Sequence, residues 1–310
     1  MDLSAINPAV LVASLMVASV PILLAAIGEL VVEKAGVLNL GVEGMMIMGA
    51  VTGFATAVQT GSPYLGFLGG AAGAAALSLV FAFLTQVLLA NQVATGLALT
   101  LFGLGLSSLI GQGYVGVKPP LTTDVPFGPL ADIPVLGTVL FSHDWMVYVS
   151  VAVIAAVWAV LKFTRTGLIL RAVGENHEAA HALGYKVGRI RLAAIVFGGA
   201  MAGLGGAYVS LIRVPQWTDG ITGGAGWIAL AIVVFASWKP WRVLVGGYLF
   251  GGITVLQLNL QAAGAAIPVE YLSMSPYLIT ILVLVIMSSG RGRASLTAPA
   301  ALGQNFHASR

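Results

Sequence analysis

Residues 8–28 read PAVLVASLMVASVPILLAAIG, an apolar run without a charged side chain. A helix needs roughly 20 predominantly apolar residues to cross a bilayer, so this run is long enough to span one. Further apolar runs occupy residues 37–58, 65–89, 92–112, 145–163, 192–213, 225–238, 243–262 and 272–289. The pattern predicts an all-α fold, a polytopic transmembrane helix bundle of about 8–10 spans.

The composition of the whole chain also indicates an integral membrane protein. Of 310 residues, 58% are hydrophobic and 8% are charged, whereas a soluble domain carries about 25% charged residues. The chain contains no cysteine, which excludes disulfides and thiolate metal sites. Asp2 is the only charged residue before Glu29, so the first run lacks the basic flank of a signal peptide and is expected to remain as a span.

The charged residues orient the spans. Segment 162–191 is rich in lysine and arginine. After Glu270 the chain contains three arginines and no aspartate, glutamate or lysine. The positive-inside tendency places both regions in the cytoplasm and leaves the aspartate-bearing loop 113–144 outside. The net charge of +3 is small and these loops explain it, so we expect no nucleic acid partner. The expected organisation is one membrane domain, residues 1–290, with a cytoplasmic loop at 164–191, and a short, polar, mobile cytoplasmic tail at 291–310.

Residues 36–44, GVLNLGVEG, place polar side chains and glycines inside an apolar stretch. An ionised carboxylate near the bilayer centre costs about 2.5 kcal/mol or more, so Glu43 should face protein, water or a partner. Asn39 lies four residues before it and would share its helix face. These residues predict an irregular or closely packed element beside a translocation pathway or another helix. The alternative is that Glu43 lies near the cytoplasmic mouth and merely acts as a cap or pairs with Lys34.

A second polar group precedes the run at 92–112. Asn91 and Gln92 carry amides, which can bind sugar or base edges without a fixed charge. Amides inside a membrane can equally hydrogen-bond one helix to another. The candidate translocation residues are therefore Asn39, Glu43, Asn91 and Gln92.

The cytoplasmic loop contains ILRAVGENHEAAHALGYKVGRIRL, residues 169–192. Asn176 is a favourable N-cap and Gly184 a favourable stop, which predicts a helix of about two turns between them. A helix this short is marginal alone in water, so its alanines indicate a contact surface rather than a solvated connector. His177 and His181 have the i, i+4 spacing of metal ligands, but no third ligand accompanies them and we expect no metal.

The order Glu178-Ala179-Ala180, three residues, then Gly184 resembles the EAA---G loop of ABC importer permeases. The resemblance implies a coupling helix that docks on an ATP-hydrolysing subunit, with Glu175 at its amino-terminal edge. The isoleucine and Leu-Pro pair that the maltose-type branch has further on are missing, because Ala194 and Ile195 stand in that neighbourhood.

Other segments narrow the resemblance. ELVVEKAGVLNLGVEGMMIMGA (29–50), LLANQVATGLAL (88–99), GGAMAGLGGAYVSL (198–211) and GWIALAIVVFASWKPW (226–241) resemble the branched-chain amino acid, simple sugar and nucleoside permeases. The GVLNLGVEGMM segment is most similar to the nucleoside and simple-sugar subgroup. This resemblance implies a second permease subunit, an ABC ATPase that carries ATP and Mg²⁺, an extracytoplasmic solute-binding protein, and a bacterial or archaeal cytoplasmic membrane.

The expected function is therefore the permease subunit of an ATP-driven importer of nucleosides or related sugars. The chain has no G-x-x-x-x-G-K-[ST] phosphate loop, so we expect a transport subunit that is not an enzyme, with ATP hydrolysis in another polypeptide. The alternative is an ion-coupled secondary transporter or a channel. Such carriers usually show several intramembrane acids, whereas Glu43 is nearly alone here, with Glu29 and Glu33 near the predicted boundary.

Overall fold

The computed structural model describes residues 8–122, 125, 127–262 and 298–307, with isolated positions between 271 and 285. Within these residues the chain forms helices and no strand. The α-helices are α1 (Pro8–Lys34), α2 (Val42–Thr60), α3 (Pro63–Ala82), α4 (Gln92–Gly111), α5 (Leu136–Leu140), α6 (Trp145–Phe163), α7 (Arg165–Glu175), α8 (His177–Ala182), α9 (Val187–Tyr208), α10 (Ala225–Phe235) and α11 (Pro240–Ala262). Two helices continue into π-helical turns, Phe83–Val87 and Val209–Arg213, and two 3-10 turns are Gln112–Tyr114 and Gly128–Leu130.

The predicted membrane bundle is confirmed. In the described residues, 6 helices are long and apolar enough to cross a membrane: Pro8–Lys34, Pro63–Val87, Gln92–Tyr114, Trp145–Phe163, Val187–Arg213 and Pro240–Ala262. The run 37–58 becomes α2, a 19-residue helix that begins only at Val42. The run 225–238 becomes α10, which has 11 residues. Most of the run 272–289 lies outside the described residues.

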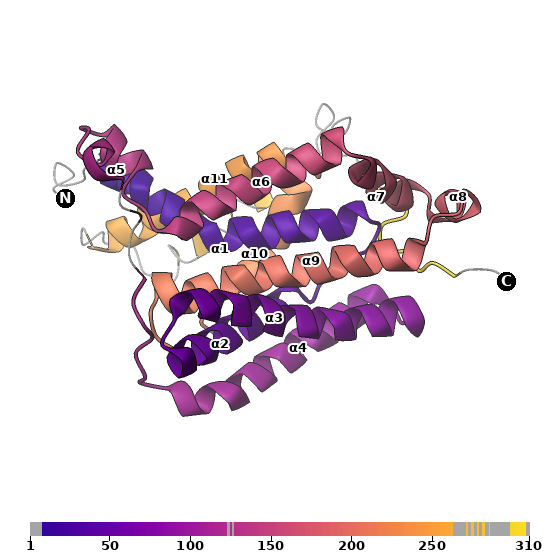
Figure 1. The fold of residues 1–310 in the computed structure, drawn as a ribbon, viewed down its shortest axis with the longest axis horizontal. Coiled ribbons are helices and arrows are strands. Elements are labelled where there is room, and N and C mark those ends of the chain that lie inside the picture. The colour runs from indigo at the N-terminus through magenta and orange to yellow at the C-terminus, as the bar shows by residue number, and fades with distance from the viewer. Residues whose placement is uncertain are drawn as a thin grey trace.

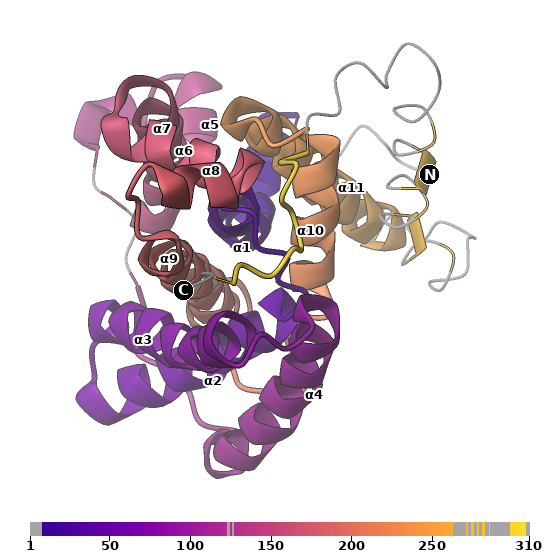
Figure 2. The ribbon, with the colours of Figure 1, turned by 90° about the vertical axis from the view of Figure 1, so that its right-hand side faces the viewer.

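The bundle has two distinct ends (Figure 1). α8 and the carboxyl-terminal stretch lie at one end, and α5 and the start of α1 lie at the other. Seen from the α8 end, α1 and α9 run near the middle, with α2, α3 and α4 on one side of them and α5, α6 and α7 on the other (Figure 2). α1 therefore passes from the α5 end towards the α8 end.

Glycine allows the central helices to touch backbone to backbone. A Cβ atom on Gly49 of α2 would lie 2.3 Å from Gly203 Cα of α9, and one on Gly206 would lie 1.8 Å from the Met46 carbonyl oxygen. Gly199 and Gly203, four residues apart on α9, both lie against α3. Close approach of this kind provides the van der Waals contact that holds helices together in lipid, where apolar burial alone cannot do so.

The expectation of a mobile tail is wrong for residues 298–307. The Ala301 amide donates to the Gly174 carbonyl oxygen at 2.9 Å, and the Gly303 amide donates to that of Gly36 at 3.2 Å. Ala301 is buried against the bundle. This stretch crosses the α8 end of the bundle (Figure 2). Backbone hydrogen bonds to distant parts of the chain fix it, and the small polar composition of the tail gave no sign of them.

Candidate functional site

The chain between α1 and α2 is non-helical, and we call residues 35–41 the junction segment. Its residues Ala35, Val37 and Asn39 are buried. Irregular backbone in an apolar environment is tolerated only where protein groups satisfy its polar atoms. The sequence prediction of an irregular element in GVLNLGVEG is therefore confirmed. Polar groups around it must satisfy its backbone N–H and C=O groups.

Two side chains from other helices bind the backbone of the junction segment. The Leu38 amide donates to Gln92 Oε1 of α4 at 2.8 Å. The Asn39 amide donates to Glu29 Oε1 of α1 at 3.2 Å. Both donors would otherwise be buried without a partner, at a cost of about 1–3 kcal/mol each. Gln92 and Glu29 thus hold the segment between α1 and α4.

Asn39 stabilises the same segment from within. Its Oδ1 accepts the Gly41 amide at 2.9 Å, which turns the chain into α2. Its Nδ2 lies 3.4 Å from the Met45 sulfur. The Leu40 carbonyl oxygen receives the Thr100 hydroxyl of α4 at 3.1 Å. The amide predicted as a candidate solute contact is thereby engaged with its own backbone.

Glu43 in the first turn of α2 binds the start of α10. Its Oε1 accepts the Thr222 hydroxyl at 2.5 Å and the Gly224 amide at 3.0 Å. Its Oε2 accepts the Gly226 amide at 2.7 Å. The amino ends of α2 and α10 meet here, and the partial positive charge at both ends favours a carboxylate. The carboxylate therefore caps the start of α10, as the alternative allowed, and its hydrogen bonds go to α10 and the turn before it rather than to Lys34.

The structure thus brings Asn39, Glu43 and Gln92 together around the junction segment. Asn91 lies apart from them on the surface, where its Oδ1 caps α4 by accepting the Ala94 amide at 3.0 Å. The observed contacts of all four side chains are structural. Their role as solute contacts stays a prediction.

The short helix predicted in the 164–191 loop is confirmed as α8. Asn176 Oδ1 accepts the Ala179 amide at 2.9 Å, and Gly184 has φ +87°, a conformation that glycine adopts without strain. Glu175, Glu178, Ala179 and Gly184 are exposed, and Ala180 packs against Val173 and Val187. Leu183, which directly follows α8, is 78% exposed. The helix therefore presents an apolar and acidic surface away from the bundle.

Arg191 joins α8 to the junction segment, a role that sequence reasoning missed. Its side chain is fully buried, and its Nε donates to the Ala35 carbonyl oxygen at 3.2 Å. Its Nη2 lies 3.2 Å from His177 Nδ1 of α8. Because a guanidinium can only donate, Nδ1 must accept and is unprotonated. Burial first, and then the positive charge of Arg191, lower the pKa of His177, which Glu178 partly opposes.

The profile of the family described as "Branched-chain amino acid transport system / permease component" matches residues 11–287. The chain belongs to this permease family. Its match covers every helix from α2 to α11 and most of α1.

Several named permeases are similar to this one over nearly their whole length. A Haloferax volcanii permease, TsgC13, provisionally named for glucose, is 40% identical over 94% of this chain and 95% of its own. The nucleoside permease NupC of Lactococcus lactis is 33% identical over 96% of both chains. The guanosine permease NupQ of Bacillus subtilis is 34% identical over 89% of this chain and 91% of its own. Haloferax volcanii and Bacillus subtilis each contain a second permease relative, at 27% and 24% identity.

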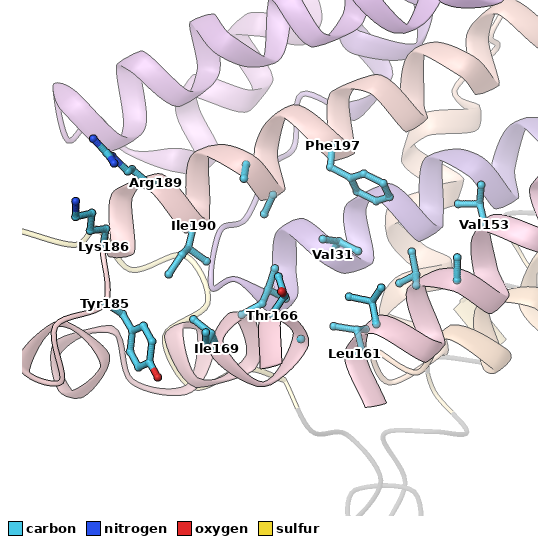
Figure 3. A pocket seen from close by; sticks show the side chains of 17 residues that line it. Val31, Val153, Leu161, Thr166, Ile169, Tyr185, Lys186, Arg189, Ile190 and Phe197 are labelled. Atoms are coloured by element: carbon cyan, nitrogen blue, oxygen red, sulfur yellow. The ribbon is translucent and has the colours of Figure 1, made fainter. Parts of the chain in front are cut away.

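The permease also contains a cavity of about 610 Å³ between α1, α6, α7 and α9. Figure 3 shows apolar side chains such as Val31, Leu161 and Phe197 around it, with Lys186 and Arg189 at one end. None of the candidate translocation residues lines this cavity. Its mostly apolar wall offers few hydrogen-bonding groups for a sugar or a base, so it does not replace the junction segment as the candidate solute region.

Proposed function

We propose that this permease is one membrane-spanning subunit of an ATP-driven importer of nucleosides or related simple sugars. Family membership supports transport by an ABC system, and the relatives named for nucleosides, guanosine and glucose support the cargo class. ATP and Mg²⁺ would be bound by a separate ATPase subunit, because this chain has no phosphate-binding loop motif.

The observation that carries the proposal is the exposed surface of α8. Glu178, Ala179 and Leu183 face away from the bundle at one end, on a capped helix too short to be stable alone. Docking of the ATPase on this surface would place α8 and the carboxyl terminus in the cytoplasm. Movement of the ATPase would then displace α8 and bias the bundle between inward and outward openings.

The opposite end offers the surface for a solute-binding protein. Loop 113–144, with α5, and the first part of the stretch 214–224 before α10 lie there in the proposed topology. A second permease subunit would complete the transport unit. The second relatives in Haloferax volcanii and Bacillus subtilis support a non-identical partner, with this chain in the place of TsgC13 and NupQ.

The test compares Gly184→Ala with Gly188→Ala in otherwise intact importer. Gly184 has a positive φ, so an alanine there strains the end of α8, whereas Gly188 has an ordinary φ and open space around it. We expect Gly184→Ala, and also Glu178→Arg, to lose uptake of labelled guanosine or glucose and to release the ATPase during purification. Gly188→Ala should behave as wild type.

Energy supply separates this proposal from its alternative. Uptake that stops on ATP depletion and survives collapse of the proton and sodium gradients supports the importer. Uptake that follows an ion gradient in cells retaining ATP, or normal ATPase assembly in the Gly184 and Glu178 variants, would contradict it.

A further inference from the structure

Residues 298–307, which we call the tail strap, form hydrogen bonds to the backbone of three separate parts of the permease. Besides the backbone bonds to Gly174 of α7 and Gly36 of the junction segment, Asn305 Nδ2 donates to the Leu89 and Ala90 carbonyl oxygens at 2.6 and 3.2 Å. Those two residues lie just before α4. The strap therefore bridges the end of α7, the junction segment and the start of α4.

The strap also meets the buried polar groups of the site. The Gln304 carbonyl oxygen accepts Arg191 Nη1 at 2.9 Å and Gln92 Nε2 at 3.4 Å. Gln92 Nε2 donates to Asn305 Oδ1 as well, at 3.0 Å. Because the other end of the Gln92 amide receives the Leu38 amide, one side chain joins the strap to the junction segment.

Phe306 fixes the strap to α8. Its ring lies edge-on to both imidazoles, with ring centroids 5.4 Å from His177 and 5.3 Å from His181. His177 and His181, the i, i+4 pair with the spacing of metal ligands, thus pack against an aromatic ring. Beside it, a hollow of about 300 Å³ is walled by α8 residues and by Ala300, Ala301 and Gln304 of the strap. Glu175 and Glu178 line the same hollow.

We propose that the tail strap helps to couple the displacement of α8 to the junction segment. It completes the docking surface of α8 and connects α8 to the junction segment. α8 is too short to hold its position by its own hydrogen bonds, so its contacts decide where it lies. Those contacts are Arg191, which binds His177, the pair Val173 and Val187, which pack against Ala180, and Phe306 of the strap. A displacement of α8 therefore reaches Gln92 and the junction segment through the strap as well as through Arg191. The partner that moves α8 is the ATPase of the proposed function, on which this inference rests.

The test removes the contact of the Phe306 ring with His177 and His181. We expect Phe306→Ala to reduce guanosine or glucose uptake roughly 2- to 30-fold, the range for side chains that carry coupling between sites. Purified importer carrying this variant should keep its ATPase subunit and continue to hydrolyse ATP, so the transport per ATP falls. Phe306→Tyr, which keeps the ring, should restore it. A strap with a merely structural role would lower the amount of importer and leave this ratio unchanged, which would overturn the inference.

His307→Ala is the matched control. His307 directly follows Phe306 in the strap, its side chain is exposed, and it does not line the hollow beside α8. We expect wild-type uptake from it. Equal uptake in wild type, Phe306→Ala and His307→Ala would refute the role of the strap in coupling.

A readout that needs no cargo separates the two proposals. Hydrogen exchange of the full chain should be faster at α8 and at the Leu38 amide in Phe306→Ala than in His307→Ala. If wild-type uptake proves independent of ATP while this difference is found, the proposed function fails and the strap linkage stands. If exchange at these amides is the same in both variants, the linkage fails whatever the cargo.

Discussion

The Glu43 carboxylate lies at the amino end of α10, where its Oε2 accepts the Gly226 amide at 2.7 Å. The two residues are 183 positions apart in the chain. The backbones of the two residues are also in close contact, since a Cβ atom on Gly226 would lie 2.6 Å from Glu43 Cα. One side chain therefore fixes the start of α10 against the start of α2. An 11-residue helix is about 16 Å long, roughly half the hydrocarbon core, so its amino end would need such a partner.

Replacing Glu43 should primarily lower the stability of the permease. Glu43→Ala leaves the Thr222 hydroxyl and the Gly224 and Gly226 amides without an acceptor, at roughly 1–3 kcal/mol for each buried group left unpaired. Glu43→Gln keeps one acceptor oxygen, replaces the other by an NH₂ donor that cannot accept, and loses the charge that favours both helix ends. We expect a lower melting temperature in detergent for both, with alanine the worse. Glu178→Gln, an exposed carboxylate, is the control and should melt as wild type. Wild-type melting of Glu43→Ala would contradict the capping role.

The features that sequence could predict are those with local signals. Residues 145–163 became α6 with the same bounds, because the run is apolar and Asp144 caps it. α8 was predictable from Asn176 and Gly184, which act on residues beside them. The run 37–58 misplaced the start of α2, because hydropathy does not detect irregular backbone that distant side chains satisfy.

The site itself depends on contacts that no local pattern carries. Arg191 binds the Gln304 carbonyl oxygen 113 residues away, and nothing in GRIRL distinguishes it from the exposed Arg189. Gln92 binds residues 54 positions before it and 213 after it. The polar residues of the site were recognisable because charge and amides are costly in lipid, whereas their partners were not.

Alanine at Gly206 should separate α2 from α9. Its Cβ would lie 1.8 Å from the Met46 carbonyl oxygen, so the two backbones must move apart. Overpacking of this kind costs about 1–3 kcal/mol, and we expect a lower melting temperature and less folded permease. Gly105→Ala in α4 is the matched control, because nothing lies within 4 Å of its Cβ position. Equal melting temperatures for the two variants would show that α2 and α9 are not packed at this distance.

Gln92→Ala tests the junction segment. It leaves the Leu38 amide unpaired and removes the bonds to the tail strap, so we expect a stability loss of about 1–3 kcal/mol and faster hydrogen exchange at Leu38. The neighbouring Asn91→Ala removes only an exposed helix cap, at about 1 kcal/mol, and should leave exchange at Leu38 unchanged. Lost uptake in Gln92→Ala with normal melting and exchange would instead assign Gln92 to the solute pathway.

Acidification should loosen α8 from the strap through His177. Burial and Arg191 hold the pKa of His177 below its ordinary value of about 6.5. Below about pH 6.5, α8 held against the strap therefore binds fewer protons than α8 released from it. The stability of the held position is complete above about pH 6.5 and declines as the pH falls below it. Protonation at Nδ1 would also break the hydrogen bond that Arg191 donates. A fluorophore on Leu183→Cys, the only cysteine in such a chain, can follow α8 against pH. We expect a transition below pH 6.5 that His177→Gln abolishes; a transition that persists in His177→Gln, or docking that tightens on acidification, would rule this out.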